Sequence, residues 1–260
     1  MPERSSFQPG EFCWSDMGTQ DLDAMVGFYT AVFGWETENV SPPEAPVKYF
    51  MMRQNGKDVT AIGWKDDPSP QTLGPYIAVE NADATVARAK ELGANVIVEP
   101  IDIADNGRMA VLQDPTGAVI ALWQAGTGIG ATLRDEPGAM CWFELNTSDL
   151  DSARDFYTSL FGYSIDDISD ETMTYNVLLL ESLPEGQRSV AGIYSSEDLP
   201  KGWTVCFAVD DADAHVERAR SNAGKVLSEP VDSPYGRYAL LQDPNGATFS
   251  VMKMAWMPAG

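Results

Sequence analysis

The chain has 260 residues, of which 44% are hydrophobic, and this is enough for two compact domains with apolar cores. Its 39 acidic residues outnumber its 17 Lys and Arg residues, giving a formal net charge of −22 at pH 7. Such a field repels nucleic-acid phosphates and anionic membrane surfaces, so we exclude both as partners. It would attract a cationic ligand, although a solvated acidic surface explains the same charge.

The N-terminus and the cysteines predict a cytoplasmic protein. The first residues lack the basic segment and apolar stretch of a signal peptide. No apolar run approaches the roughly 18 residues of a membrane helix. Three cysteines without zinc-type spacing predict reduced thiols. We interpret Cys13 and Cys141 as small buried strand residues.

In chain order, the first predicted module is a strand, a helix and short strands. The run FCWSDM predicts a strand, and Asp21 is a good N-cap for the amphipathic helix that follows. Gly34 ends this helix. Strand-like runs then lie around 48–53 and 59–64.

A second module of the same kind follows. A strand at 75–79 leads to a helix that ends at Gly93, and two more strands meet at the turn Asp-Pro-Thr-Gly, which starts at Asp114. The segment 126–139 has the Gly content of a linker.

The whole pattern then occurs a second time. The stretch CWSDMGTQDLDAMVGFYTAVFGW begins at Cys13, and CWFELNTSDLDSARDFYTSLFGY begins at Cys141. Likewise LQDPTGA at Leu112 matches LQDPNGA at Leu241. We therefore predict a tandem duplication of an α+β domain, with four β-α-β-β-β modules in all. The predicted units are domain 1 (1–125), a linker (126–139) and domain 2 (140–260).

These motifs resemble the vicinal-oxygen-chelate superfamily, which includes glyoxalases, bleomycin-resistance proteins and extradiol dioxygenases. The resemblance rests on a Phe-Tyr helix followed by an Asp-Pro-x-Gly turn, found twice, from Phe28 to Asp114 and from Phe156 to Asp243. The chain is also similar to a narrower actinobacterial group of two-domain members labelled glyoxalases or hydroxylases. The resemblance implies two half-open β-sheet cups that hold the ligand. It also implies a monomer, because the fused copies imitate the dimer of single-domain members.

The resemblance further implies where metal ligands would lie: a His or Gln in the first strand, a His before the second helix and a Glu in the last strand. The matching positions are Trp14, Gly74 and Ala121 in copy one and Trp142, Thr204 and Ser250 in copy two. None is a usual metal donor. The only histidine, His215, is expected to be an exposed helix residue. We therefore predict that the chain binds no metal of the usual kind.

Strand alternation places carboxylates beside the aromatic residues of the expected cups. Asp16 and Glu144 are the candidate catalytic residues, because burial in a pocket raises the pKa of a carboxyl group. They could equally anchor a cationic group or hydrogen-bond to backbone. The candidate ligand-binding residues are Trp14, Tyr76, Trp123, Trp142, Cys206, Met252, Arg108 and Arg237. For the tryptophans the alternative is a core role, and for the arginines it is a structural ion pair.

Two hypotheses about function follow. The first is a metal-free protein that binds a small aromatic or cationic molecule, such as an antibiotic or a reactive metabolite, between Trp faces. The second is an enzyme, either a glyoxalase-like lyase or a hydroxylase-type tailoring enzyme of aromatic polyketide metabolism that uses Asp16 and Glu144. The sequence holds no flavin or nicotinamide motif, so we expect no cofactor.

Overall fold

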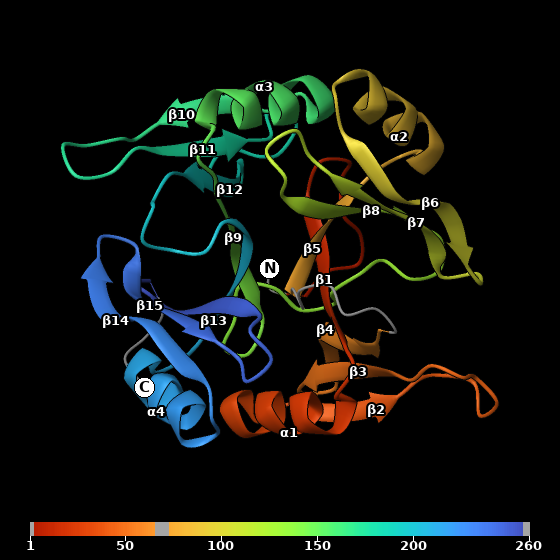
Figure 1. Cartoon of the computed structure of the whole chain (residues 1–260), viewed down its shortest axis with the longest axis vertical. Coiled ribbons are helices and arrows are strands. Elements are labelled where there is room, and N and C mark those ends of the chain that lie inside the picture. Colours follow the sequence, from red (N-terminus) through yellow and green to blue (C-terminus); the bar gives the residue numbers. More distant parts are fainter. Residues whose placement is uncertain (1–2, 66–72, 257–260) are drawn as a thin grey trace.

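The computed structural model describes residues 3–65 and 73–256. They form two eight-stranded mixed sheets, one for each copy of the repeat, with helices packed on them (Figure 1). The prediction of a duplicated α+β fold is confirmed. Neither sheet closes on itself.

The first sheet has the strand order β2-β3-β4-β1-β5-β8-β7-β6, so its two modules meet where β1 pairs with β5. Its elements are β1 (Phe12–Thr19), α1 (Leu22–Phe33), β2 (Glu36–Asn39), β3 (Tyr49–Gln54), β4 (Lys57–Trp64), β5 (Leu73–Ala78), α2 (Ala82–Glu91), β6 (Asn95–Ile103), β7 (Gly107–Gln113) and β8 (Val119–Ala125).

The second sheet repeats this plan in the order β10-β11-β12-β9-β13-β16-β15-β14. Its elements are β9 (Met140–Asn146), α3 (Leu150–Phe161), β10 (Ser164–Asp167), β11 (Tyr175–Leu179), β12 (Ser189–Tyr194), β13 (Gly202–Ala208), α4 (Ala212–Ser221), β14 (Lys225–Ser233), β15 (Gly236–Gln242) and β16 (Thr248–Met254).

Local sequence determines where the first helix of each copy begins and ends. The Asp21 side chain accepts a hydrogen bond from the Ala24 amide and caps α1. Gly34 ends α1 in the left-handed conformation, with φ of 75°, which favours glycine. Asp149 and Gly162 do the same for α3. Both α1 and α3 therefore begin and end at equivalent residues of the repeat.

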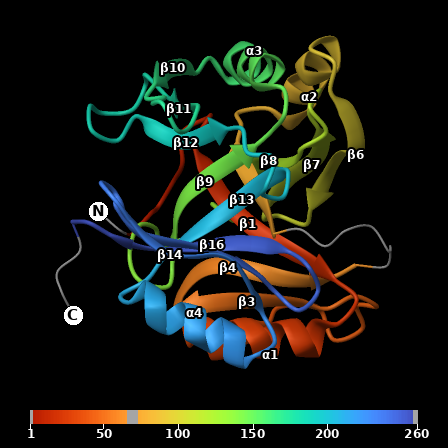
Figure 2. The ribbon, with the colours of Figure 1, turned by 60° about the vertical axis from the view of Figure 1, so that its left-hand side comes forward.

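The two copies are joined through helices and turns that belong to opposite copies. Helix α1 lies beside α4, and α2 lies beside α3 (Figures 1 and 2). The Tyr29 hydroxyl on α1 donates to Asp243 in the second copy at 3.1 Å, and the Tyr157 hydroxyl on α3 donates to Asp114 in the first at 2.8 Å. The two sequence motifs, Phe-Tyr and Asp-Pro-x-Gly, thus hydrogen-bond to each other across the interface.

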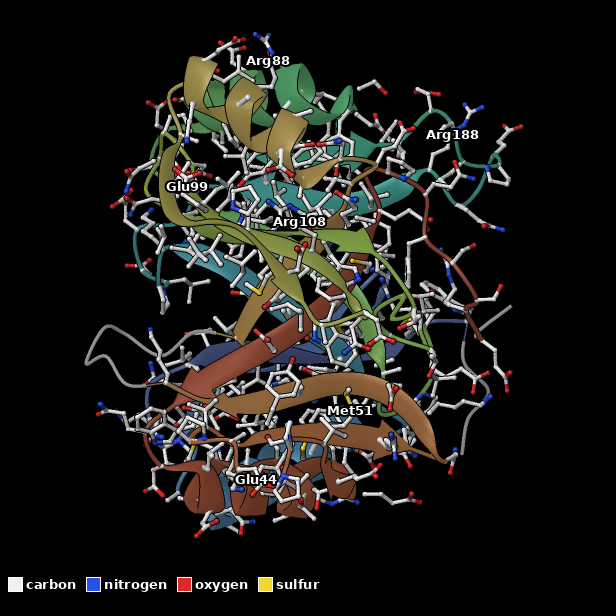
Figure 3. All side chains as sticks on the ribbon, turned by 90° about the vertical axis from the view of Figure 1, so that its right-hand side faces the viewer. Glu44, Met51, Arg88, Glu99, Arg108 and Arg188 are labelled. Atoms are coloured by element: carbon white, nitrogen blue, oxygen red, sulfur yellow. The ribbon has the colours of Figure 1, made fainter. Side chains whose placement is uncertain are left out.

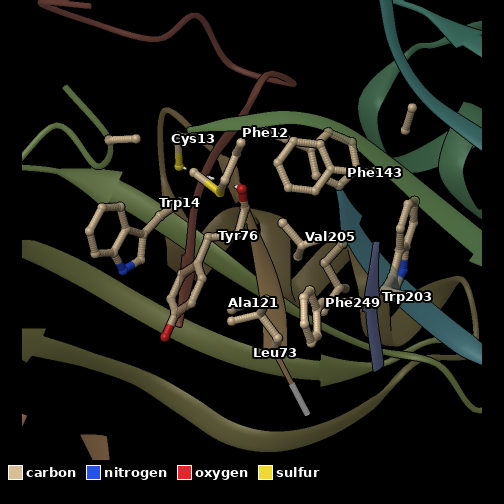
Figure 4. Packing of buried hydrophobic residues seen from close by; sticks show 14 of the residues in the cluster. Phe12, Cys13, Trp14, Leu73, Tyr76, Ala121, Phe143, Trp203, Val205 and Phe249 are labelled. Atoms are coloured by element: carbon tan, nitrogen blue, oxygen red, sulfur yellow. Dashed lines mark hydrogen bonds between the residues drawn. The ribbon is translucent and has the colours of Figure 1, made fainter. Parts of the chain in front are cut away.

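A β-bulge in β1 sends neighbouring aromatic residues to opposite faces of the sheet. Phe12 pairs with Ile77 and Trp14 with Tyr76, so Cys13 is the extra residue. Phe12 stacks on Phe143 of the other copy, with ring centroids 4.5 Å apart, whereas Trp14 and Tyr76 point away from that pair (Figure 4). The bulge therefore directs Phe12 toward the other copy and Trp14 toward the opposite face of the sheet.

The only histidine corrects one expectation. His215 on α4 is 5% exposed and packs against Phe33, with ring centroids 5.7 Å apart, so it is buried between the copies and not exposed. The helix α1 of the first copy covers this residue, and a single helix pattern does not reveal such a neighbour. No helix in the described parts of the chain is long and apolar enough to cross a membrane.

Candidate functional site

On the face of the first sheet that carries Trp14 and Tyr76, which we call cup 1, a carboxylate lies at the centre of an aromatic cluster. The hydroxyls of Tyr49 and Tyr76 both donate to Oδ2 of Asp16, each at 2.9 Å. The Trp14 indole N–H donates to the Tyr49 hydroxyl at 3.3 Å. The result is a chain of hydrogen bonds that runs from Trp14 through Tyr49 to Asp16.

Strand pairing explains why these side chains meet. Asp16 pairs with Gly74 and Trp14 pairs with Tyr76 across β1 and β5, so all point to one face. Tyr49 on β3 pairs with Gly63 on β4. A Cβ atom at Gly63 would lie 2.8 Å from the Tyr49 ring, so only glycine leaves room for this ring.

Cup 2, the corresponding face of the second sheet, contains the same chain. The Trp142 indole N–H donates to the Tyr175 hydroxyl, and that hydroxyl donates to Oε1 of Glu144, each at 2.8 Å. The Tyr175 ring stacks on Tyr194 at an interplanar angle of 10°. Tyr238 on β15 supplies the second phenol near the carboxylate, a role that Tyr76 on β5 plays in cup 1.

Burial shifts the protonation of both carboxylates in the same direction. It raises the pKa of Asp16 to about 6, and the hydrogen bonds from Tyr49 and Tyr76 oppose this rise only in part. Burial likewise raises the pKa of Glu144 against hydrogen bonds from its two tyrosines. The pKa of Tyr49 is also raised by burial and by Asp16. The phenols therefore stay protonated as donors, while the Asp16 carboxyl group can exchange protons near neutral pH.

The strand register shows which residues lie in one row with Trp14 and Trp142, and it differs from the expected row by two residues at one position. Trp14, Tyr76 and Ala121 lie side by side across β1, β5 and β8. In copy two the equivalent row is Trp142, Cys206 and Ser250. Tyr76 and Cys206 thus replace Gly74 and Thr204 in the expected set, because the pairing register could not be read from sequence.

These residues do not fit a divalent metal of the family type. Indole, phenol, methyl and hydroxyl groups, with the single thiol of Cys206, replace the imidazole and carboxylate donors that such a metal needs. Within the described residues, no three His, Cys, Asp or Glu side chains gather closely enough to hold a metal ion. The donor set therefore disagrees with a metal centre at either cup.

Two further predicted residues occupy equivalent positions at the edges of the cups. Trp123 lies edge-on to Tyr76, with ring centroids 6.5 Å apart, and its indole N–H donates to the Gly128 carbonyl at 2.8 Å. Met252 takes the corresponding place on β16 and pairs with Tyr238. Both are half-buried and remain candidates for ligand contact.

The structure does not bring the two arginines together with the cup residues. Arg108 forms ion pairs with Asp83 of α2 and Asp102 of β6, both at 2.8 Å. It lies on the strands below α2 (Figure 3). Arg108 pairs with Gln124, and the next pair along the strands is Met109 with Trp123. Because Trp123 faces cup 1 and neighbouring strand residues point to opposite faces, Arg108 faces away from cup 1.

Arg237 repeats this arrangement in the second copy. It pairs with Asp213 at 2.6 Å and Asp232 at 3.1 Å. The expected ligand contacts of Arg108 and Arg237 are therefore corrected to structural ion pairs.

The tyrosines on β3 and β11 are the functional candidates that sequence analysis missed. Tyr49 and Tyr175 occupy equivalent places and make equivalent bonds in the two cups. Their shared position in the repeat was the available signal. A polar crevice between the copies, lined in part by Thr116, Thr147 and Lys201, lies elsewhere, and its free space of about 100 Å³ is too small for a drug-sized molecule.

Comparison with known proteins identifies the family. Residues 14–122 and 139–251 both match the family model described as the glyoxalase/bleomycin resistance protein/dioxygenase superfamily. The chain belongs to this superfamily. The resemblance inferred from the duplicated motifs is thus confirmed, and each copy is one glyoxalase-type domain.

Curated relatives match this two-domain glyoxalase-family protein along nearly its full length. "Putative glyoxylase CFP32" of Mycobacterium tuberculosis is 39% identical, covering 98% of this chain and 99% of the relative. "Anthracycline biosynthesis protein DnrV" of Streptomyces peucetius is 37% identical, and the match covers 95% of this chain and 94% of that relative.

Solved structures share the fold at low identity. A Mn(II)-bound glyoxalase from Novosphingobium aromaticivorans has a TM-score of 0.66 at 16% identity, covering 95% of this chain and 82% of its own. The 2,2',3-trihydroxybiphenyl 1,2-dioxygenase of Sphingomonas wittichii has a TM-score of 0.65 at 11% identity, covering 97% and 93%. At such identities, these likenesses concern the fold alone.

Proposed function

We propose that the protein binds a small, planar, oxygenated aromatic molecule or organic cation in its cups, without a divalent metal. The observation that carries this proposal is the chain of hydrogen bonds from Trp through Tyr to a carboxylate, present in both copies. Apolar and aromatic walls with a few directed polar groups are the usual design of a small-molecule site.

The carboxylates indicate what the ligand must provide. Asp16 and Glu144 are half-buried, and their hydrogen-bond partners in the described structure are neutral phenols. A buried carboxylate is stabilised by a cation or by an additional hydrogen-bond donor. A ligand with an ammonium group would also interact favourably with the faces of Trp14 and Trp142. A phenolic hydroxyl group would provide the donor.

One curated relative supports an aromatic ligand. The Streptomyces peucetius relative is named for anthracycline biosynthesis. Anthracyclines are polycyclic aromatic molecules with oxygen substituents. The match of this relative over 95% of this chain includes both domains. Such a ligand combines the flat surface and the polar groups that the cups are equipped to bind.

A second candidate, an acid–base tailoring enzyme, is favoured by the pKa of Asp16. A carboxyl group with a pKa of about 6 can both accept and donate a proton near neutral pH. Tyr49 and Tyr76 would hold it toward the ligand. Perturbed carboxyl groups of this kind often lie at active sites.

One titration separates the two candidates. A fluorescent anthracycline added to the purified protein should quench Trp fluorescence in a saturable manner, and mass spectrometry should recover the anthracycline unchanged. In Asp16→Asn and Glu144→Gln the affinity should fall at least tenfold. The protein would instead be an enzyme if it converted the anthracycline into a product, and if the two variants lost this conversion while keeping their affinity for the anthracycline. Absence of saturable quenching would contradict the proposal.

A further inference from the structure

Two thiols of the second copy face each other across β9 and β13. The Sγ atoms of Cys141 and Cys206 are 3.7 Å apart, and the Cys141 Sγ lies 3.5 Å from the Cys206 carbonyl oxygen. A β-bulge produces this contact, because Cys206 pairs with Trp142 and Phe207 pairs with Met140. Cys141 is therefore the extra residue of β9 and is turned toward its cross-strand neighbour.

We propose that Cys141 and Cys206 form a site of reversible oxidation beside cup 2, where a peroxide converts the two thiols into a disulfide. Sulfur atoms in a disulfide are about 2.05 Å apart, so the pair must approach by less than 2 Å. The two cysteines lie on adjacent paired strands, because Cys206 pairs with Trp142, the residue next to Cys141.

The first copy offers a matched contrast. Cys13 occupies the equivalent bulge and contacts the Tyr76 carbonyl oxygen at 3.6 Å, just as Cys141 contacts that of Cys206. Tyr76 holds the position that Cys206 holds in the second copy. Filling the bulge explains one cysteine in each copy. The second thiol of copy two is the additional feature, and only there is a thiol pair formed among the described residues.

Exposure indicates the order of the chemical steps. Cys141 is half-buried, whereas Cys206 is completely buried. The Cys141 thiolate would attack one peroxide oxygen, break the O–O bond and form a sulfenic acid, and the other oxygen would leave as water after taking up a proton. The Cys206 sulfur would then attack the Cys141 sulfur, and the hydroxyl would leave as water with the Cys206 proton. Two thiols are oxidised, and one peroxide is reduced to two water molecules.

The environment disfavours the reactive thiolate form of Cys141. The neighbouring Cys206 and burial raise the pKa of the Cys141 thiol, so little thiolate is present at neutral pH. The disulfide would lie next to Trp142, which donates to Tyr175 in cup 2. We therefore expect oxidation to change cup 2 and leave cup 1 unaltered. This consequence for ligands rests on the proposed function, whereas formation of the disulfide does not.

The test is peroxide treatment of the full-length protein without any ligand. Reduced protein is incubated with excess hydrogen peroxide, free thiols are alkylated, and peptides are mapped by mass spectrometry. The expected product carries one disulfide, between Cys141 and Cys206, with Cys13 alkylated. Dithiothreitol should restore three alkylatable thiols. The melting temperature should rise by roughly 5 °C or more on oxidation, because the bond closes a long loop.

Variants make the assignment specific. Cys206→Ser should leave Cys141 as a sulfenic acid that dimedone traps, and Cys13→Ser should leave the disulfide unchanged. Irreversible oxidation of Cys141 beside a free Cys206 in the parent protein would overturn the proposal. A disulfide that involves Cys13 would also overturn the proposal. As a control, the same peroxide treatment is applied to the protein unfolded in urea. If that treatment oxidises the unfolded protein but leaves three free thiols in the folded protein, the proposal is also overturned.

Discussion

Replacing Asp16 by Asn should stabilise the protein at neutral pH, because this carboxylate is held in an environment that disfavours its charge. Its pKa rises to about 6 in the folded chain, against about 3.9 for an unperturbed Asp. At about 1.4 kcal/mol per pKa unit, the shift corresponds to about 3 kcal/mol. Because Asp16 is half-buried and still reaches water, and because the amide of Asn adds donors of its own, we expect a gain of about 1–3 kcal/mol.

The direction of the pH dependence follows from proton binding. Between pH 4 and pH 6 the folded state holds a proton on Asp16 that the unfolded state has released, so the free energy of unfolding falls as pH rises through this window. Above it the difference between the two proteins is constant. Asp16→Asn should therefore match the parent protein near pH 3.5 and exceed it increasingly up to about pH 6.

Urea unfolding of both proteins at several pH values measures this difference. Asp83→Asn is a matched control of opposite sign, because the ion pair with Arg108 lowers the pKa of Asp83. As pH rises above the lowered pKa of Asp83, the free energy of unfolding of Asp83→Asn should fall slightly below that of the parent protein. If Asp16→Asn were less stable than the parent at pH 7.5 by 1 kcal/mol or more, Asp16 would be a structural anchor for Tyr49 and Tyr76, and the functional interpretation would fail.

Three further predictions concern the interface, cup 2 and the surface ion pairs. Tyr157→Phe removes the 2.8 Å hydrogen bond that buried Asp114 receives from the other copy. Urea titrations should show the free energy of unfolding lowered by about 1–3 kcal/mol. A loss below about 0.3 kcal/mol would show that this hydrogen bond is dispensable. In Gly192→Ala the new Cβ would lie 2.0 Å from the Tyr175 hydroxyl and displace it. Anthracycline affinity should therefore fall at least tenfold, while circular dichroism shows that the fold is retained. Unchanged affinity would exclude Tyr175 from the site. Arg108→Ala should leave anthracycline affinity within twofold of the parent value in the same titration, because its ion pairs lie away from cup 1; a tenfold loss would return Arg108 to the site.

Much of the fold could be predicted because its signals are local and occur twice. The caps at Asp21 and Gly34 recur at Asp149 and Gly162, and hydrogen bonding and backbone conformation at these residues bear out the helix limits. The Phe-Tyr and Asp-Pro-x-Gly motifs identified the family. Their physical role, a hydrogen bond between the copies, required the packing of two domains and could not be read from one.

The site was only partly predictable, because strand register depends on loops and bulges. Alternation from Trp14 correctly put Asp16 on the same face, since both lie on one strand after the bulge. The assignment of Gly74 was two residues out of register with Trp14, and nothing local to β5 fixes that register. Tyr49 reaches Asp16 from β3, across β4, so its contribution depends on the pairing of three strands.

The central claim is that the cups bind their ligand without a divalent metal. The most direct test is the anthracycline titration performed on protein dialysed against EDTA, then repeated after addition of Zn²⁺, Ni²⁺, Mn²⁺ or Fe²⁺. We predict saturable quenching of Trp fluorescence in the chelated protein, with a Kd that changes less than twofold when metal is added. Binding that occurs only after a metal is restored would contradict the claim and place a metal centre in this chain.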